Sequence, residues 1–232
     1  MTRRSGAKTR KKVASRERAC CQRGPGDGVA SVNPANEDHG PYQRSSAATH
    51  LSRSRLCDGV HVALTGTPGT GKSSVGVALE RRGYVVIDLD ELARREGLIV
   101  GRDEARQTDE IDVDALRRAV RVPAKIAFLK GHYSHLMDVN LAIVLRCRPS
   151  VLRARLEARG WPEAKVRENV EAEAIDVILQ EATSRLPFVF EIDTSNTTAA
   201  QTAERVLAIL QGKREGHEPG SVDWSDEVLS WY

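Results

Sequence analysis

A glycine-rich octapeptide carries the clearest chemistry in this chain of 232 residues. Its spacing fits G-x-x-x-x-G-K-[ST], the pattern of a phosphate-binding P-loop. Glycines let the backbone bring its N–H groups close to an anion, a lysine reaches the β- and γ-phosphates of a nucleotide, and a serine hydroxyl is a ligand for Mg²⁺. The octapeptide and the residue after it form the candidate phosphate-binding set: Gly66, Thr67, Pro68, Gly69, Thr70, Gly71, Lys72, Ser73 and Ser74.

The segments on either side of the loop are those that the motif requires. The apolar run 60–64 predicts a buried strand, and the apolar residues of 72–82 predict a helix. A helix that begins at Lys72 adds its N-terminal dipole to the N–H groups of the loop. We therefore expect Lys72 to act in catalysis and Ser73 to bind the metal.

The alternation of strand and helix continues to residue 210. Strands are predicted at 60–64, 84–88, 124–129, 141–145 and 188–192, and helices at 72–82, 91–96, 113–120, 149–159, 162–185 and 199–210. Asp90 is the predicted N-cap of the second helix, and the polar stretch 101–110 receives no element. Short apolar strands separated by helices are typical of an α/β fold with a parallel sheet covered on both faces.

Charge divides the chain into two parts. Residues 1–57 hold 12 Lys and Arg against 4 Asp and Glu, whereas residues 58–232 hold 23 against 28. We expect a disordered basic tail at 1–57. Its basic run either contacts nucleic acid or an anionic surface, or is simply solvated or upstream of the natural start. A folded domain is expected at 58–214. The aromatic residues of the C-terminal tail, 215–232, indicate either docking on the domain or contact with a partner.

Cysteine usage and hydropathy bear on the compartment. The four cysteines include no C-x-x-C pair, which favours a reduced protein. No apolar stretch approaches the roughly 18 residues of a membrane span, and the basic N-terminus lacks the apolar region of a secretory signal. We expect a cytoplasmic protein with no membrane partner.

Polar residues follow the predicted strands at their carboxyl ends, where ligands bind in open α/β sheets. Asp88 and Asp90 follow the second strand, and Lys130 and His132 follow the third. His132 is a candidate active-site residue. A zinc site at His132 and His135 is not favoured, because no cysteine or acidic pattern accompanies them.

Basic residues gather on the helices between 149 and 170. A phosphotransferase needs cations to neutralise the transferred group and a lid to exclude water. Arg159, beside the turn Gly160-Trp161, is the candidate for this function. Arg153 and Lys165 are expected on a solvated face, where Arg153 and Glu157 form an i,i+4 pair.

Residues 60–212 resemble the adenylate kinase isoenzyme 6 family, also described as CINAP-like or archaeal-type adenylate kinases. The resemblance implies a three-layer P-loop NTPase fold whose five-stranded parallel sheet has the order 2-3-1-4-5. It rests on the P-loop and on the segments 90–94 (DELAR), 131–132 (GH), 144–146 (VLR), 155–161 (RLEARGW) and 168–173 (ENVEAE), of which the last two are the most specific.

The resemblance also implies an activity. Members transfer the γ-phosphoryl group of ATP to AMP with the help of Mg²⁺, hydrolyse ATP slowly, bind a small-subunit ribosomal protein and assist maturation of the small ribosomal subunit. An NMP-binding region is implied at about 89–122, where Asp90 and Arg94 would contact the acceptor. A short lid without zinc is implied at about 158–168, from which Arg159 would contact the nucleotide.

One position departs from the pattern of the family. The family usually has an acidic residue two positions before the histidine, where it holds Mg²⁺ through the water shell, and this chain has Lys130. Because a lysine repels the metal, we expect that Asp88 or Asp90 substitutes or that catalysis is weak. Replacement of Lys130 by Asp or Glu is then expected to lower the Mg²⁺ requirement and speed transfer.

Two other functions stay open. A P-loop kinase of a small metabolite, similar to shikimate kinase, is supported by the pair Asp88 and Asp90 and opposed by the lack of a glycine triplet after the third strand. A nucleotide-switched ribosome assembly factor with little kinase activity is supported by Lys130 and the basic tail.

Overall fold

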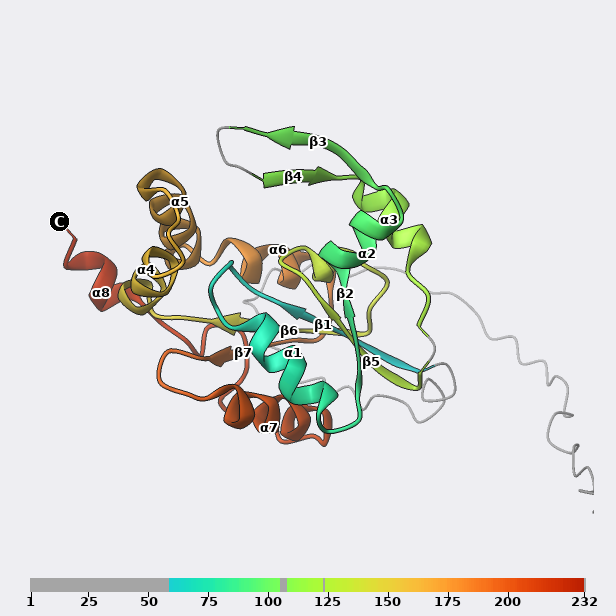
Figure 1. Cartoon of the computed structure of the whole chain (residues 1–232). Coiled ribbons are helices and arrows are strands. Elements are labelled where there is room, and N and C mark those ends of the chain that lie inside the picture. The colour runs from blue at the N-terminus through green and yellow to red at the C-terminus, as the bar shows by residue number, and fades with distance from the viewer. Residues whose placement is uncertain (1–58, 105–107, 123, 232) are drawn as a thin grey trace, which may run out of the picture. The chain divides into compact units, whose positions relative to one another are not determined.

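The computed structural model of the chain describes residues 59–104, 108–122 and 124–231 (Figure 1). The basic tail expected at 1–57 lies outside these ranges. A parallel sheet forms the centre of the described part. Its five strands are β1 (Val60–Thr65), β2 (Val85–Asp88), β5 (Ile126–Lys130), β6 (Leu141–Arg146) and β7 (Val189–Asp193).

The strands lie in the order β2-β5-β1-β6-β7, and all neighbouring pairs are parallel. These numbers differ in detail from the expected order 2-3-1-4-5, because two unpredicted strands, β3 and β4, precede β5 in the chain. When only the five strands of this sheet are numbered along the chain, each strand has the neighbours that were expected. The central position of β1 places the loop that follows it at the middle of the carboxyl edge of the sheet.

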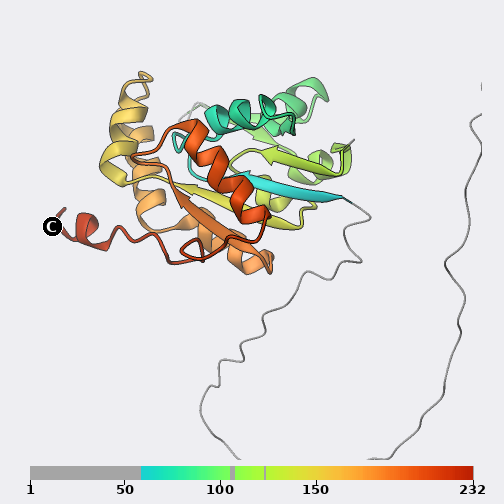
Figure 2. The same cartoon turned by 90° about the horizontal axis from the view of Figure 1, so that it is seen from below.

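Helices cover both faces of the sheet (Figures 1 and 2). On one face, α1 (Lys72–Glu80) and α7 (Ala199–Leu210) share an apolar cluster with the strands. On the other face, α6 (Val177–Arg185) packs on β1 and β6, while α2 (Leu89–Arg95) and α3 (Val113–Ala119) pack at the end of β5. None of the helices within the described ranges is long and apolar enough to cross a membrane.

The long helix expected at 162–185 is wrong, because the chain forms α5 (Glu163–Ala174) and α6 with a break between them. Asp176, in the break, has a φ of 60°, a left-handed conformation that interrupts a right-handed helix. Its carboxylate pairs with the buried guanidinium of Arg146, which stabilises the break. The break lets α6 lie on the sheet while α5 packs against α4 (Pro149–Glu157).

The N-cap of α2 is Asp88 and not the expected Asp90. The Asp88 carboxylate accepts hydrogen bonds from the backbone N of Asp90 at 3.0 Å and of Glu91 at 3.3 Å. Both aspartates precede the same apolar run, so the sequence pattern did not distinguish them. The Asp90 carboxylate instead accepts a hydrogen bond from the hydroxyl of Tyr133 at 2.7 Å.

An antiparallel hairpin of β3 (Ile99–Asp103) and β4 (Thr108–Ile111) occupies a stretch for which no element was predicted. Its residues are exposed or half-buried on both sides, so it has no apolar face that an alternating pattern would reveal. The hairpin projects from α2 and α3 toward α5 (Figure 1).

The C-terminal segment 215–231 packs along β7. The backbone N of Glu191 donates to the carbonyl of His217 at 2.8 Å, and the N of Val222 donates to the Glu191 carboxylate at 2.8 Å. In α8 (Ser225–Leu229), the Glu227 carboxylate accepts a hydrogen bond from the first turn of α4 at 2.7 Å. Within the described residues, this segment is therefore docked on the domain.

Candidate active site

The P-loop turns between the end of β1 and the start of α1. Gly66 has a φ of 133°, and a Cβ there would lie 2.3 Å from the carbonyl oxygen of Leu145 on β6. A Cβ at Gly69 would lie 2.6 Å from Cδ1 of Leu152 on α4. The glycines thus let β6 and α4 press against the loop, a packing that side chains would prevent.

Lys72 is the first residue of α1, where backbone N–H groups have no partner within the helix. Its ammonium donates to the carbonyl oxygens of Gly66 at 2.6 Å and Thr67 at 3.0 Å. Burial lowers the pKa of Lys72 to about 8, although Asp90 and Glu173 raise it. An anion beside this ammonium would compensate for its lost hydration, and the dipole of α1 favours the same anion.

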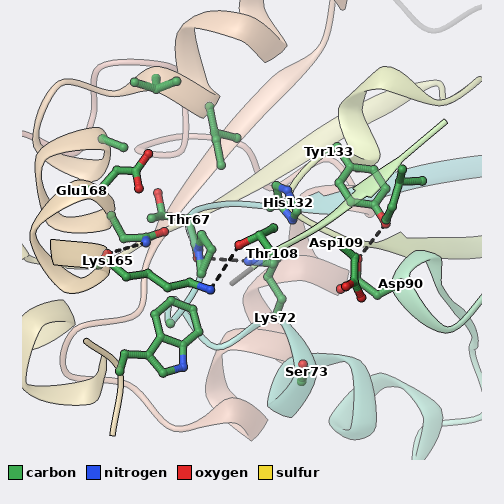
Figure 3. A pocket seen from close by; sticks show the side chains of 18 of the residues that line it. Thr67, Lys72, Ser73, Asp90, Thr108, Asp109, His132, Tyr133, Lys165 and Glu168 are labelled. Carbon is green, nitrogen blue, oxygen red and sulfur yellow. Dashed lines mark hydrogen bonds between the residues drawn. The ribbon is translucent and has the colours of Figure 1, made fainter. Parts of the chain in front are cut away.

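A cleft of about 690 Å³ opens in front of the P-loop (Figure 3). Helix α2 and the hairpin form one wall, and α5 and α6 form the other. Gly66 and Thr70 are buried parts of the loop and do not line the cleft. The other predicted site residues do: Thr67, Pro68, Gly69, Gly71, Lys72, Ser73, Ser74, Asp90, Arg94, His132 and Arg159.

Cations line both walls of this cleft. Arg94 on α2 and Arg102 on β3 belong to one wall, where Asp109 lies 3.9 Å from Arg94 and 3.5 Å from Arg102. Arg159 and Lys165 come from the α4–α5 region opposite. Cations on both sides of a phosphate-binding loop are suited to neutralising more than one phosphate group.

The basic residues of α4 and α5 divide between the surface and the cleft. Arg153 pairs with Glu163 at 2.9 Å and with Glu157 at 3.6 Å, as expected for a solvated face. The same expectation is wrong for Lys165, whose ammonium donates to the hydroxyl of Thr108 on β4 at 3.2 Å (Figure 3). Lys165 thus links α5 to the hairpin across the cleft. The charged residues of α5 occur on several sides of the helix, so their pattern does not indicate which side faces the cleft.

The two aspartates after β2 have different surroundings. Asp90 lines the cleft, where the Tyr133 hydroxyl holds its carboxylate (Figure 3). Asp88 pairs with Lys130, its register partner on β5, and neither residue is among those that line the cleft. Burial raises the pKa of Asp88, but the hydrogen bond and charge of Lys130 hold it below its usual value. Of the two carboxylates expected to replace the missing acid, only Asp90 lies in the cleft.

The two histidines after β5 also differ. Both histidines line the cleft. Partial desolvation of the His132 ring by its neighbours and the charge of Lys72 lower the pKa of His132. Its imidazole is therefore neutral at pH 7. His135 is 2% exposed, with Nδ1 at 3.2 Å from the Thr65 hydroxyl and Nε2 at 3.1 Å from the Glu181 carboxylate, contacts typical of a structural residue.

A second cavity of about 240 Å³ lies on the other side of the P-loop. It is enclosed by α1, α4 and the segment after β7, and threonines form much of its wall. Arg159 lines both this cavity and the main cleft. A ligand that extends from one to the other would therefore pass beside the Arg159 guanidinium.

Four residues of this region were not among the predicted site residues: Arg102, Tyr133, Lys165 and Glu173. Arg102 lies on the unpredicted hairpin, and Lys165 was placed on the solvated face of α5. Tyr133 and Glu173 did carry a signal, because Tyr133 follows His132 at a strand end and Glu173 closes the segment 168–173. Their partners, Asp90 for Tyr133 and Thr67 for Glu173, lie far away in the chain and cannot be identified from sequence spacing.

Known proteins similar to this chain show its family. Residues 62–176 match a protein family described as an AAA domain. A protein of Archaeoglobus fulgidus named "Putative adenylate kinase" is 45% identical over 170 residues, which cover 72% of this chain and 93% of that protein. A protein of the same name from Natronomonas pharaonis is 42% identical over 171 residues, which cover 73% of this chain and 100% of that protein.

This chain belongs to the family of these adenylate kinase-like P-loop kinases. It is accordingly a nucleoside monophosphate kinase by family. A shikimate kinase from Acinetobacter baumannii has the same fold, with a TM-score of 0.50 over 70% of this chain and 98% of that chain. At 15% sequence identity this likeness concerns the fold alone.

Proposed function

We propose that this chain is an adenylate kinase that transfers the γ-phosphoryl group of ATP to AMP and hydrolyses ATP slowly. The observation that carries the proposal is the single cleft in which the P-loop faces cations on two opposite walls. One nucleotide needs only the P-loop and its nearest cations, so Arg94 and Arg102 suit a second substrate that bears a phosphate. The names of the relatives support AMP as that substrate.

ATP would lie across the P-loop. The backbone N–H groups of the loop and the first turn of α1 bind its phosphates, and Lys72 neutralises charge on the β- and γ-phosphates. The second cavity has room for the nucleoside part, so that Arg159 meets the phosphate chain between the two cavities. Arg159 then stabilises charge that develops as the phosphoryl group moves.

AMP would occupy the opposite wall. Arg94 and Arg102 present planar guanidinium groups, which bind phosphate oxygens in a bidentate manner. His132 lines the cleft near Lys72, whose charge lowers its pKa, and its neutral imidazole would donate a hydrogen bond to a phosphate without adding charge (Figure 3). Lys165, which reaches β4 from α5 across the cleft, would help to exclude water from the transfer.

The donor set of the cleft fits Mg²⁺. Ser73 and Asp90 contribute a hydroxyl and a carboxylate, the oxygen ligands that this cation prefers. The residues that the structure describes form no cluster of three or more His, Cys, Asp or Glu side chains, which suits a cation that keeps several waters and binds mainly to substrate phosphates. When bound, Mg²⁺ neutralises charge on the phosphates. Ser73 would contact it directly, and Asp90 would hold its water shell.

An acceptor panel tests this proposal. We would measure ATP consumption with Mg²⁺ and, in separate reactions, AMP, CMP, GMP, UMP and shikimate. Consumption that requires AMP supports the proposal. Consumption that requires shikimate and ignores every nucleotide would replace it with the metabolite kinase alternative.

The resemblance to the isoenzyme 6 family adds a proposed cellular role to the enzymatic one. It implies a protein that binds a small-subunit ribosomal protein and assists maturation of the small subunit. The basic composition of residues 1–57, which the resemblance does not cover, suits contact with rRNA, and the cysteine usage suits the cytoplasm. A pull-down of a purified small-subunit ribosomal protein, with and without ATP, tests this part. Equal recovery by the chain and by beads alone would reject it.

A further inference from the structure

The buried carboxylate of Glu173, on α5, contacts the P-loop. Glu173 is 3% exposed, and its Oε2 accepts a hydrogen bond from the hydroxyl of Thr67 at 2.6 Å. Its Oε1 accepts from Nε of Arg146 at 2.8 Å and from the backbone N of Cys147 at 3.0 Å. One side chain therefore joins the loop, the end of β6 and helix α5.

Arg146 holds this carboxylate in place. Its side chain is 1% exposed and forms ion pairs with Glu173, with Asp176 and with Glu191, the last at 2.8 Å. The Glu191 carboxylate in turn accepts a hydrogen bond from the backbone N–H of Val222, so the same network reaches the C-terminal segment. A buried guanidinium with several carboxylate partners has few alternative positions, because each displaced partner would leave a buried charge unpaired.

The contact with Thr67 bears on the catalytic lysine. The carbonyl oxygen of Thr67 accepts hydrogen bonds from the Lys72 ammonium at 3.0 Å and from the Thr70 hydroxyl at 2.8 Å. The Thr67 side chain, fixed by Glu173, thus determines where this carbonyl lies. Together with the carbonyl of Gly66, which accepts from the same ammonium at 2.6 Å, the Thr67 carbonyl holds Lys72 within the loop.

Glu173 also fixes the helix that forms the opposite wall of the cleft. Lys165, Asn169 and Glu173 follow one another at intervals of four residues, so they lie on one face of α5. Lys165 and Asn169 line the cleft, and Glu173 meets the P-loop at the end of the same face. The hydrogen bond between Thr67 and Glu173 therefore connects the loop to this wall.

We propose that Glu173, held by Arg146, is a positioning residue that fixes the Thr67 peptide of the P-loop and couples the loop to α5. The inference rests on the proposed function, because it assigns the loop to ATP. Loss of the contact is expected to weaken ATP binding selectively and to leave the acceptor site unchanged.

Paired substitutions at Thr67 in the full chain test the proposal. Thr67→Val removes the hydroxyl and keeps the shape, so we expect the Kd for Mg·ATP and the KM for ATP to rise roughly tenfold, with the KM for AMP unchanged. Thr67→Ser keeps the hydroxyl and should restore both values to within about twofold. Thr183→Val is the matched control, since the hydroxyl of Thr183 bonds only within α6, and it should change none of these values.

Glu173→Gln and Arg146→Lys test the other end of the network. Both should raise the Kd for Mg·ATP, and Glu173→Gln should do so less than Thr67→Val because an amide can still bond to the hydroxyl. If either variant fails to fold, the Thr67 pair decides alone. Wild-type ATP binding by Thr67→Val, with only a lower melting temperature, would overturn the inference.

The binding measurement separates this inference from the proposed function. If the wild-type chain binds Mg·ATP but phosphorylates no nucleotide, the proposed function fails while the Thr67 series still tests the coupling. If the wild-type chain does not bind Mg·ATP, both fail.

Discussion

The ammonium of Lys130 forms an ion pair with the carboxylate of Asp88, at the ends of two neighbouring strands. The Lys130 side chain is 15% exposed, and its stem passes close to Gly76 of α1 instead of entering the cleft. Its charge is therefore compensated locally. A residue that the sequence placed beside Mg²⁺ instead joins β5 to β2, and of the two aspartates that follow β2 it is Asp90 that lines the cleft.

This arrangement predicts how two substitutions change the need for magnesium. Lys130→Met should leave the Mg²⁺ concentration at half-maximal rate within about twofold of wild type, whereas Asp90→Asn should raise it roughly tenfold, because it removes a carboxylate from the cleft. A magnesium titration of the transfer rate checks both. A marked improvement in Lys130→Met with no change in Asp90→Asn would show that the lysine does act on the metal.

Lys130→Glu is no longer expected to speed transfer. Glutamate at this position would face Asp88 across the paired strands, and like charges at such positions are destabilising.

The pKa of Lys72 predicts the pH dependence of ATP binding. This pKa is about 8 because burial lowers it, and a bound polyphosphate favours the protonated form. The favourable charge is thus present below pH 8 and is lost as the pH rises. We expect the Kd for ATP to increase roughly tenfold between pH 7 and pH 9, measured by titration calorimetry.

Lys72→Arg provides the control for this measurement. A guanidinium keeps its charge throughout that range, so the variant should show only the titration of ATP itself. Equal slopes for wild type and Lys72→Arg would mean that the Lys72 ammonium does not titrate near pH 8.

Two arginines separated by less than two helical turns should differ in their effect on turnover. Arg159 lines both cavities, whereas Arg153 forms surface ion pairs with Glu157 and Glu163. Arg159→Ala should lower kcat/KM roughly a hundredfold, because it removes a charge that stabilises the moving phosphoryl group. Arg153→Ala should stay within about twofold, as surface pairs contribute little. Similar losses in steady-state assays of the two variants would refute the lid assignment of Arg159.

The docked C-terminal segment should contribute to stability. Trp224 is 8% exposed and lies over the guanidinium of Arg146, with 6.0 Å between the ring centroid and Cζ. Trp224→Ala should lower the free energy of unfolding by about 3 kcal/mol, as measured by denaturant titration. Trp231 is 43% exposed, and Trp231→Ala should change it by less than about 0.5 kcal/mol. If the two variants were equally stable, the segment would not be docked in solution.

The sheet and the P-loop were predictable because their signals are local. The apolar runs that became β1, β2, β5, β6 and β7 lie within two residues of their predicted limits, and α7 matches its prediction at both ends. The P-loop motif itself specifies glycine at Gly66 and Gly71, and at Gly66 the structure has no room for a side chain.

Features that depend on distant partners were not predictable. The break between α5 and α6 depends on the pairing of Asp176 with Arg146, 30 residues earlier in the chain. The position of Lys130 depends on strand pairing with Asp88, and the hairpin β3–β4 lacks an apolar face. Glu173 meets Thr67 across 106 residues, so no sequence window contains both.

The central claim is that this chain moves a phosphoryl group from ATP to AMP. The most direct test is to incubate the full chain with ATP, AMP and Mg²⁺ and to quantify all three nucleotides over time. Once the ADP formed in a parallel reaction without AMP is subtracted, the account predicts two ADP formed for each AMP consumed. Lys72→Ala should form no ADP in either reaction, and its circular dichroism should match wild type. ADP that appears at the same rate without AMP, or an AMP concentration that stays constant, would contradict it.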